Sequence, residues 1–266
     1  MNIFKRHQKF VSSKDFYPPI IIRLIKGIMR KMGYRVLESQ INNYFIHPII
    51  LEHLRKLKTS AQYCEDLLIY LLLDCKEKGF YVDIGANNPS ELSNTEFFYN
   101  RGWNGINIEP DPLLYEVFKV TRDRDINLNI GIGNQNQELD FYRLSANTLS
   151  TFSNSAANQY VRDGHKIIDI IKIPVIQLRE VFEHYAIDKQ IDFMSIDVEG
   201  YELEVLNSND WEKYRPKIIL LEVNQNPKDL LSYFDNYRYE LVFNNQTNAL
   251  FVDLNTKLQA SSTEKN

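Results

Sequence analysis

From residue 60 onward, short apolar runs alternate with segments in which apolar residues recur every three or four positions. Continuous apolar runs are typical of buried strands, and the longer period is typical of helices. Strands that alternate with helices in this order predict a parallel sheet with crossover helices. The predicted fold class is therefore α/β, with a doubly wound, mostly parallel sheet.

The same pattern predicts individual elements. Helices are predicted at 61–77, 93–102, 112–123, 178–186 and 201–210. Strands are predicted at 80–86, 105–110, 126–133, 170–176, 191–197 and 217–223, with an antiparallel addition at 137–144. Residues 237–255 form two β-rich runs around a polar turn and predict a closing hairpin. Residues 145–166 are polar and weakly periodic, so they predict an inserted loop with one helix that forms part of a substrate wall.

Residues 1–59 have a different character and predict a basic helical N-terminal extension. Residues 1–60 carry 12 Lys and Arg against 3 Asp and Glu, whereas the remainder carries 19 against 32. Within 20–32, apolar and basic residues separate onto two faces of a helix. Such a helix can contact an anionic membrane or a phosphorylated substrate, or it can pack its apolar stripe on its own domain. Residues 60–254 are predicted to form the main domain, and residues 255–266 a disordered tail.

Bulk properties narrow the class of protein. No apolar run is long enough to span a bilayer, and the N-terminus lacks the pattern of a secretory signal, so we expect a cytoplasmic protein. Cys64 and Cys75 lie too far apart on one predicted helix to pair, and we expect both to be reduced. The acidic main domain is poorly suited to bind nucleic acid, so we do not expect nucleic acid to be a partner. The oligomeric state stays open.

Acidic residues stand near the carboxyl ends of four predicted strands. The first strand ends in VDIG with Asp83, and the second ends in INIEP with Glu109. A later strand leads into Asp197 and Glu199, and the next carries Glu222. In an open parallel sheet the ligand crevice lies at the carboxyl ends of the strands. These acids are therefore predicted to converge on one site, although an acidic helix cap explains each of them singly.

The loop after the first strand has the spacing D-x-G-A-N, in which Gly85 lets the backbone approach a ligand closely. It lacks the second glycine of a dinucleotide-binding loop, because Ala86, Asn87, Asn88 and Pro89 follow. Glu109 stands where an acid at the end of the second strand accepts hydrogen bonds from ribose hydroxyls. The loop cannot hold a pyrophosphate closely. The loop and Glu109 together therefore favour S-adenosylmethionine over a nicotinamide cofactor.

Three separated segments carry a family resemblance. GFYVDIGANNPSELSNTEFFYNRGWNGINIEPDP, LSTFS and IDFMSIDVEGYELEVLNSNDW occur in that order and resemble the FkbM-type S-adenosylmethionine-dependent methyltransferases over roughly residues 60–253. The resemblance implies a class I methyltransferase (Rossmann-like) fold, a seven-stranded sheet whose last strand is antiparallel. It also implies O-methylation of a hydroxyl on a sugar, polysaccharide or glycolipid precursor, or on a natural product.

The resemblance also assigns residues. It places Asp83, Gly85, Ala86 and Asn87 in the first cofactor loop, Glu109 at the ribose, and Asp197 and Glu199 in the acidic motif after the fourth strand. Asn129 on the third strand is a candidate contact for the adenine. The family pattern has a glycine where Pro89 stands, so this chain resembles a subgroup with proline there. Ser93 or Asn94, at the start of the next helix, could then donate to the methionine carboxylate.

Methyl transfer to a hydroxyl needs a nearby general base. Asp197 is the first candidate, because it is expected one strand away from the cofactor loop. Glu199, Glu222 and His165 in the inserted loop are the others. A divalent metal on Asp197 with Glu199 or Glu222 would also acidify a hydroxyl, but no metal is predicted, since acid pairs at strand ends are common without one.

Two functions of other classes remain as alternatives. A nicotinamide-dependent oxidoreductase would explain the fold and Glu109 but requires a phosphate loop with a second close glycine. A non-catalytic scaffold that binds cofactor would keep the sheet without needing the acids of the site, yet Asp83, Glu109, Asp197 and Glu199 are all present. The methyl acceptor, a small molecule or a glycan, is not identified by the sequence.

Overall fold

The computed structural model describes residues 59–186, 189–223 and 227–255. The chain divides into two compact units, and the described part of the first consists of Thr59 and residues 67–76. The second unit comprises residues 60–66 and the chain from Glu77 onward. The predicted amphipathic helix of the N-terminal extension and the predicted tail beyond Asn255 lie outside the described residues. The predicted domain limits therefore stay predictions.

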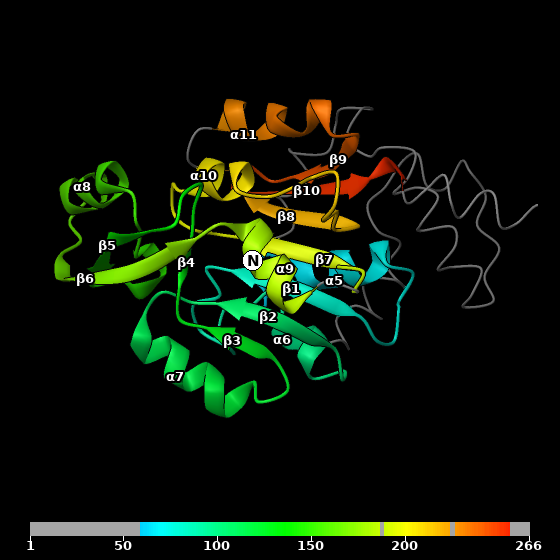
Figure 1. Ribbon diagram of the computed structural model, residues 1–266, viewed down its shortest axis with the longest axis horizontal. Helices are drawn as coiled ribbons and strands as arrows, with labels where there is room; N and C mark the ends of the chain where they lie inside the picture. The colour runs from blue at the N-terminus through cyan, green and yellow to red at the C-terminus, as the bar shows by residue number, and fades with distance from the viewer. Residues whose placement is uncertain (1–58, 187–188, 224–226, 256–266) are drawn as a thin grey trace, which may run out of the picture. The chain divides into compact units, whose positions relative to one another are not determined.

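A seven-stranded sheet forms the centre of the second unit, with the order β3-β2-β1-β7-β8-β10-β9 (Figure 1). Neighbouring strands from β3 to β8 pair in parallel, and β10 is antiparallel to both β8 and β9. The strands are β1 (Phe80–Ile84), β2 (Asn104–Ile108), β3 (Ile126–Leu128), β7 (Phe193–Ile196), β8 (Ile218–Glu222), β9 (Tyr239–Asn244) and β10 (Asn248–Asp253). The predicted mostly parallel sheet with a C-terminal antiparallel hairpin is confirmed.

Alternation along β1 distributes side chains to two faces of this sheet. Phe80, Val82 and Ile84 belong to the large apolar core, together with residues of three helices, α9 (Leu178–Tyr185), α10 (Glu202–Asn207) and α11 (Pro227–Tyr233). Tyr81 points to the opposite face, where its ring lies 5.6 Å from that of Phe193. Both faces of the strands are buried, which explains why these strands read as continuous apolar runs.

The helices confirm most of the predicted pattern. They are α5 (Glu65–Leu72), α6 (Glu96–Tyr99), α7 (Pro112–Thr121), α8 (Asn154–Arg162), α9 (Leu178–Tyr185), α10 (Glu202–Asn207) and α11 (Pro227–Tyr233). The sequence pattern did not predict α11, and α5 is shorter than the predicted 61–77. Asp111 caps α7 by accepting from the Leu113 N–H at 2.9 Å, and Pro112 supplies the preset first turn.

A second, three-stranded sheet differs from the prediction. The predicted strand 126–133 is split, because its second half, β4 (Gly131–Ile132), leaves the main sheet and pairs with β6 (Ile167–Ile176). The predicted antiparallel addition, β5 (Gln137–Leu144), also pairs with β6 and not with the main sheet. Figure 1 shows this sheet and α8 in green, beyond the carboxyl ends of the parallel strands. The inserted segment is thus carried by a sheet of its own.

Among the residues that the structure describes, no helix is long and apolar enough to cross a membrane.

Candidate functional site

A cavity of about 280 Å³ opens at the carboxyl ends of β1, β2, β7 and β8. Its walls contain nine of the residues that sequence analysis assigned or weighed for the site: Asp83, Gly85, Ala86, Asn87, Asn94, Glu109, Asp197, Glu199 and Glu222. The predicted convergence of the strand-end acids is therefore what the fold produces, because parallel strands end at the same edge.

Gly85 fits this edge for a steric reason. Its φ is +77°, and a Cβ placed there would lie 1.8 Å from the carbonyl oxygen of Asp197. The Gly85 and Ala86 N–H groups donate to the Ile108 carbonyl at 3.0 and 3.1 Å. Only glycine allows the loop after β1 to run this close to the end of β7.

Glu109 braces the loop after β1 from the end of β2. One carboxylate oxygen accepts from the Asn87 N–H at 2.6 Å, and the other accepts from the Asp111 N–H at 2.7 Å. Burial raises the pKa of Glu109 to about 8, although the two backbone hydrogen bonds act in the opposite direction. Each carboxylate oxygen has a second lone pair, so Glu109 can still accept from ligand hydroxyls in the cavity that it lines.

Asp83 is buried on β1 and is held by its neighbours. It accepts from the Thr95 hydroxyl at 2.8 Å. Burial raises its pKa to about 6, while the Thr95 hydrogen bond and the positive charge of Arg122 oppose that rise. A carboxylate buried in this way favours a cationic ligand group, which would stabilise its charged form.

Asp197, Glu199 and Glu222 form an acidic cluster, hereafter the carboxylate triad. One oxygen from each lies within 4.8 Å of the others. Burial, followed by the charge of Glu199, raises the pKa of Asp197 well above its usual value. Burial, followed by the charge of Asp197, raises the pKa of Glu222 far above the usual value for a glutamate. The three acids therefore retain protons between them near neutral pH.

The spacing of the carboxylate triad would also accommodate a hard divalent cation. Acidic groups this close together also occur without an ion, because they can share protons.

The inserted segment holds Glu199 in place. Glu199 has a φ of +54°, which costs energy for a non-glycine residue. The Tyr160 hydroxyl donates to its carboxylate, and the Thr151 hydroxyl donates to its backbone carbonyl at 2.8 Å. Burial raises the pKa of Glu199 to about 7, and the Tyr160 hydrogen bond opposes that rise. A base with such a pKa is partly ionised at neutral pH, as acid-base catalysis requires.

Aromatic side chains of the inserted region form another wall of the cavity. Phe141 from β5 and Phe152 both line it, with ring centroids 4.9 Å apart. Asn147 reaches the loop after β1, since its carbonyl accepts from the Asn87 side chain at 3.2 Å. Part of the segment 145–166 therefore lines the cavity, and its role as a substrate wall stays a prediction.

The sequence that forms this site matches a known protein family. Residues 83–247, more than half of the chain, match the model of the methyltransferase FkbM domain. The chain belongs to the FkbM methyltransferase family. Comparison with curated proteins gives no match. Among solved structures, the chain is similar to a methyltransferase from Geobacter sulfurreducens, with 12% identity, 94% of each chain covered and a TM-score of 0.39. A likeness with that TM-score bears on neither fold nor function.

Three predicted site residues of the FkbM domain have different surroundings. Asn94 lines the cavity and donates to the Ser195 hydroxyl at 3.0 Å. Asn129 is not among the lining residues, and its amide donates to the carbonyls of Glu109 and Pro110 at 2.9 and 2.8 Å. His165 is also outside the lining, and its ring packs edge-on against Tyr160. The roles predicted for Asn129 and His165 stay untested, but neither side chain faces the cavity of this FkbM domain directly.

Sequence analysis missed the side chains that support the acids. Tyr160 and Thr151 lie 39 and 48 positions from Glu199 in the FkbM domain, and no periodicity connects them. The available signal was the aromatic content of the polar segment 145–166, which contains Phe152 and Tyr160. That signal indicates a wall near the crevice but not which acid a tyrosine contacts.

Proposed function

We propose that this chain transfers a methyl group from S-adenosylmethionine to a hydroxyl oxygen of a sugar or glycolipid precursor. The observation that carries the proposal is the acidic lining of the cavity, whose carboxyl groups a cationic ligand would ionise. Seven of its lining residues are Asp or Glu, and among the described residues that line it there is no Lys, Arg or His. A cofactor with a positive sulfur and an ammonium group complements such a surface.

The cofactor fits the residues of the loop after β1. Gly85 leaves backbone space that a side chain would fill, and Glu109 presents carboxylate oxygens where ribose hydroxyls would bind. Asp83 and Asn94 line the same cavity and would face the methionine part. When bound, S-adenosylmethionine supplies a methyl carbon on positive sulfur, so that transfer forms an oxygen–carbon bond, breaks the sulfur–carbon bond and leaves S-adenosylhomocysteine.

The chain's own part in the reaction is to align the acceptor and to receive its proton. Asp197 is half-buried at the end of β7, which pairs directly with β1, so it lies one strand from the cofactor loop. Its carboxylate would take the hydroxyl proton as the oxygen bonds to carbon. Glu199 and Glu222 share protons with it and keep the added proton within the carboxylate triad.

The lining also favours one class of acceptor. A phosphate, sulfate or uronate group would meet acidic side chains with no lining cation to neutralise it among the described residues. The rings of Phe141 and Phe152 offer apolar faces, which suit the C–H face of a sugar ring. We therefore propose a sugar unit that carries no anionic group next to the methylated hydroxyl.

Neither alternative function matches the site as well. A nicotinamide-dependent oxidoreductase would have to place a pyrophosphate against Asp83, Glu109 and Asp111, which line the cavity. A non-catalytic scaffold would not need three acidic side chains held this close together, because removing them from water costs folding free energy. The methyltransferase proposal uses both features.

Binding and transfer can be tested in one series. Calorimetric titration with S-adenosylmethionine, S-adenosylhomocysteine and NADH should show binding of the first two only, and binding of NADH alone would exclude the proposal. The protein should then be incubated with methyl-labelled cofactor and the host's glycan fraction. The product should be a labelled methyl ether that resists base and elutes with the neutral products in anion-exchange chromatography.

Asp197→Asn should bind the cofactor and lose transfer, with Asp210→Asn on the surface as the matched control.

We further propose that residues 1–35 bring the enzyme to the cytoplasmic face of an anionic membrane, where glycolipid precursors are available. The support is the excess of basic residues in this part of the sequence. Full-length protein should sediment with liposomes that contain anionic lipid, and deletion of residues 1–35 should abolish sedimentation. Full-length protein that ignores such liposomes would defeat this proposal without affecting the proposed chemistry.

A further inference from the structure

We propose that Arg122 is a positioning residue that fixes the shape of residues 89–93 in the loop after β1. This inference rests on the proposed use of S-adenosylmethionine, and it concerns a residue behind the cavity that does not line it. Arg122 follows the last turn of α7 and is only 2% exposed. A buried guanidinium is costly unless its donors are satisfied, so its partners indicate what it holds.

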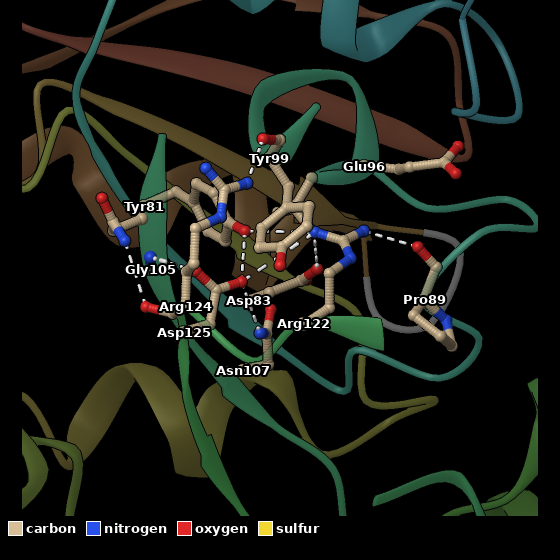
Figure 2. Close-up of polar contacts among 12 residues, drawn as sticks. Tyr81, Asp83, Pro89, Glu96, Tyr99, Gly105, Asn107, Arg122, Arg124 and Asp125 are labelled. Atoms are coloured by element: carbon tan, nitrogen blue, oxygen red, sulfur yellow. Dashed lines mark hydrogen bonds and ion pairs between the residues drawn. The ribbon is translucent and has the colours of Figure 1, made fainter. Parts of the chain in front are cut away.

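The partners of Arg122 lie at both ends of the loop. One terminal nitrogen donates to the Pro89 carbonyl and, at 3.2 Å, to the Ser93 hydroxyl. The other donates to the Tyr81 hydroxyl at 3.1 Å. Figure 2 shows the guanidinium between β1 and Pro89, with its terminal nitrogen directed to the Pro89 carbonyl. Arg122 thus fastens the first and the last residue of the five-residue segment 89–93.

This fastening bears directly on cavity residues. Glu91 and Leu92 lie within the segment, and Asn94 follows it; all three line the cavity. Leu92 has a φ of +54°, a conformation that β-carbon sterics disfavour and that surrounding contacts must maintain. Tying the loop at both ends to one rigid planar group maintains that conformation.

The same network reaches the buried acid of β1. The Ser93 hydroxyl accepts from the Thr95 N–H at 3.3 Å and from the Glu96 N–H at 3.1 Å, so it caps the start of α6. Thr95 in turn donates to Asp83 at 2.8 Å. Displacing Ser93 would therefore also disturb the orientation of the Asp83 carboxylate.

The charge of Arg122 is balanced locally. Asp125 lies 4.0 Å from the guanidinium and accepts from Tyr81 at 2.6 Å and from Gly105 N–H at 2.8 Å (Figure 2). The guanidinium also lies 4.7 Å from the centre of the Tyr99 ring. A lysine could neutralise Asp125 but could not span Pro89, Ser93 and Tyr81 from one plane.

Position 89 is a proline in this chain and a glycine in the family pattern, which explains why the loop uses a contact with Arg122. Proline offers no N–H to organise the loop, but its carbonyl is available to Arg122. In this chain the hydrogen bond from Arg122 to the Pro89 carbonyl therefore fixes the shape of the loop. The conformational flexibility of a glycine is not used.

The test compares S-adenosylhomocysteine binding across four full-length proteins by calorimetry. Arg122→Lys and Arg122→Met should raise the dissociation constant at least tenfold. Arg124→Met is the matched control, because Arg124 also lies over the Tyr99 ring, at 3.9 Å, yet it is exposed and contacts no residue of the loop. Its dissociation constant should stay within twofold of the wild type.

A second measurement separates positioning from general stability. Leu230→Ala removes a fully buried side chain of α11 and should lower the melting temperature without changing the dissociation constant. Hydrogen exchange at residues 88–94 should accelerate in Arg122→Lys and not in Leu230→Ala. A folded Arg122→Lys protein that binds like the wild type would overturn the inference. Wild-type protein that binds no S-adenosylhomocysteine would instead overturn the proposed function.

Discussion

Glu109 and Glu199 line the same cavity, but their different surroundings suit them to different proposed roles. Glu109 is held by backbone N–H groups and keeps hydrogen-bond capacity for a ligand, whereas Glu199 is held by side chains of the inserted segment. Their surroundings, not their identity, separate a binding role from an acid-base role. Each role can be tested by one substitution.

Removing the Glu109 carboxylate should weaken cofactor binding. Each hydrogen bond contributes about 0.5 to 1.5 kcal/mol, and two ribose hydroxyls are proposed to bond Glu109, so Glu109→Ala should raise the dissociation constant for S-adenosylmethionine about tenfold. Titration calorimetry measures this directly. Glu116→Ala, on the exposed side of α7, serves as the control and should bind normally. Unchanged affinity in Glu109→Ala would remove this residue from the cofactor site.

Replacing Tyr160 should change the pH dependence of methyl transfer. The Tyr160 hydroxyl stabilises the charged form of Glu199, so Tyr160→Phe should raise the pKa of Glu199. The acid limb of the rate profile should then move to higher pH by about one unit. Tyr142→Phe is the control, because the Tyr142 hydroxyl accepts from Asn154 and contacts no acid. A profile that moves equally in both variants would contradict the assigned role.

At the scale of elements, the site depends on the contact between the loop after β1 and the end of β7. These strands pair in register, and their continuations come together at Gly85 and Asp197. The small sheet of β4, β5 and β6 then brings the inserted segment over the same edge. The cavity is thus made by the ends of elements that are far apart in sequence.

Gly85→Ala should separate these two strand ends. A Cβ there would lie 1.8 Å from the Asp197 carbonyl oxygen, so the backbone must shift and cofactor binding should be lost. Gly164→Ala is the matched control, because Gly164 also has a positive φ but has nothing within 4 Å of the added Cβ. It should cost only about 1 kcal/mol of stability and leave binding intact. Calorimetry and thermal unfolding measure both effects.

At the scale of the whole molecule, acidic groups gather around the cavity that we propose binds a positively charged cofactor. Burial raises the pKa of Asp83 to about 6, of Glu199 to about 7 and of Glu109 to about 8. Because folding raises these pKa values, the acids stabilise the fold most below their unfolded pKa values near 4. That stabilisation is lost as the pH rises to about 8. A cationic ligand would restore part of it.

Cofactor affinity should therefore depend on pH in a charge-specific way. As the pH rises from about 5.5 to 7.5, more of these carboxylates ionise, and S-adenosylmethionine should bind more tightly. S-adenosylhomocysteine lacks the positive sulfur and should show a smaller rise. Calorimetry at several pH values compares the two ligands on the same protein. Equal slopes for both ligands would argue against a role for the acidic lining in binding the sulfonium.

The sequence by itself determined the α/β class, most elements of the main sheet and the set of strand-end acids. Local periodicity reports which positions are buried, and parallel strands necessarily end at one edge. Tertiary structure decided where residues 126–133 divide between two sheets and which side chains support the acids. The contacts of Tyr160 with Glu199 and of Arg122 with Pro89 join positions 39 and 33 residues apart. Such contacts depend on how elements pack, and the periodicity of a segment contains no information about its distant partners.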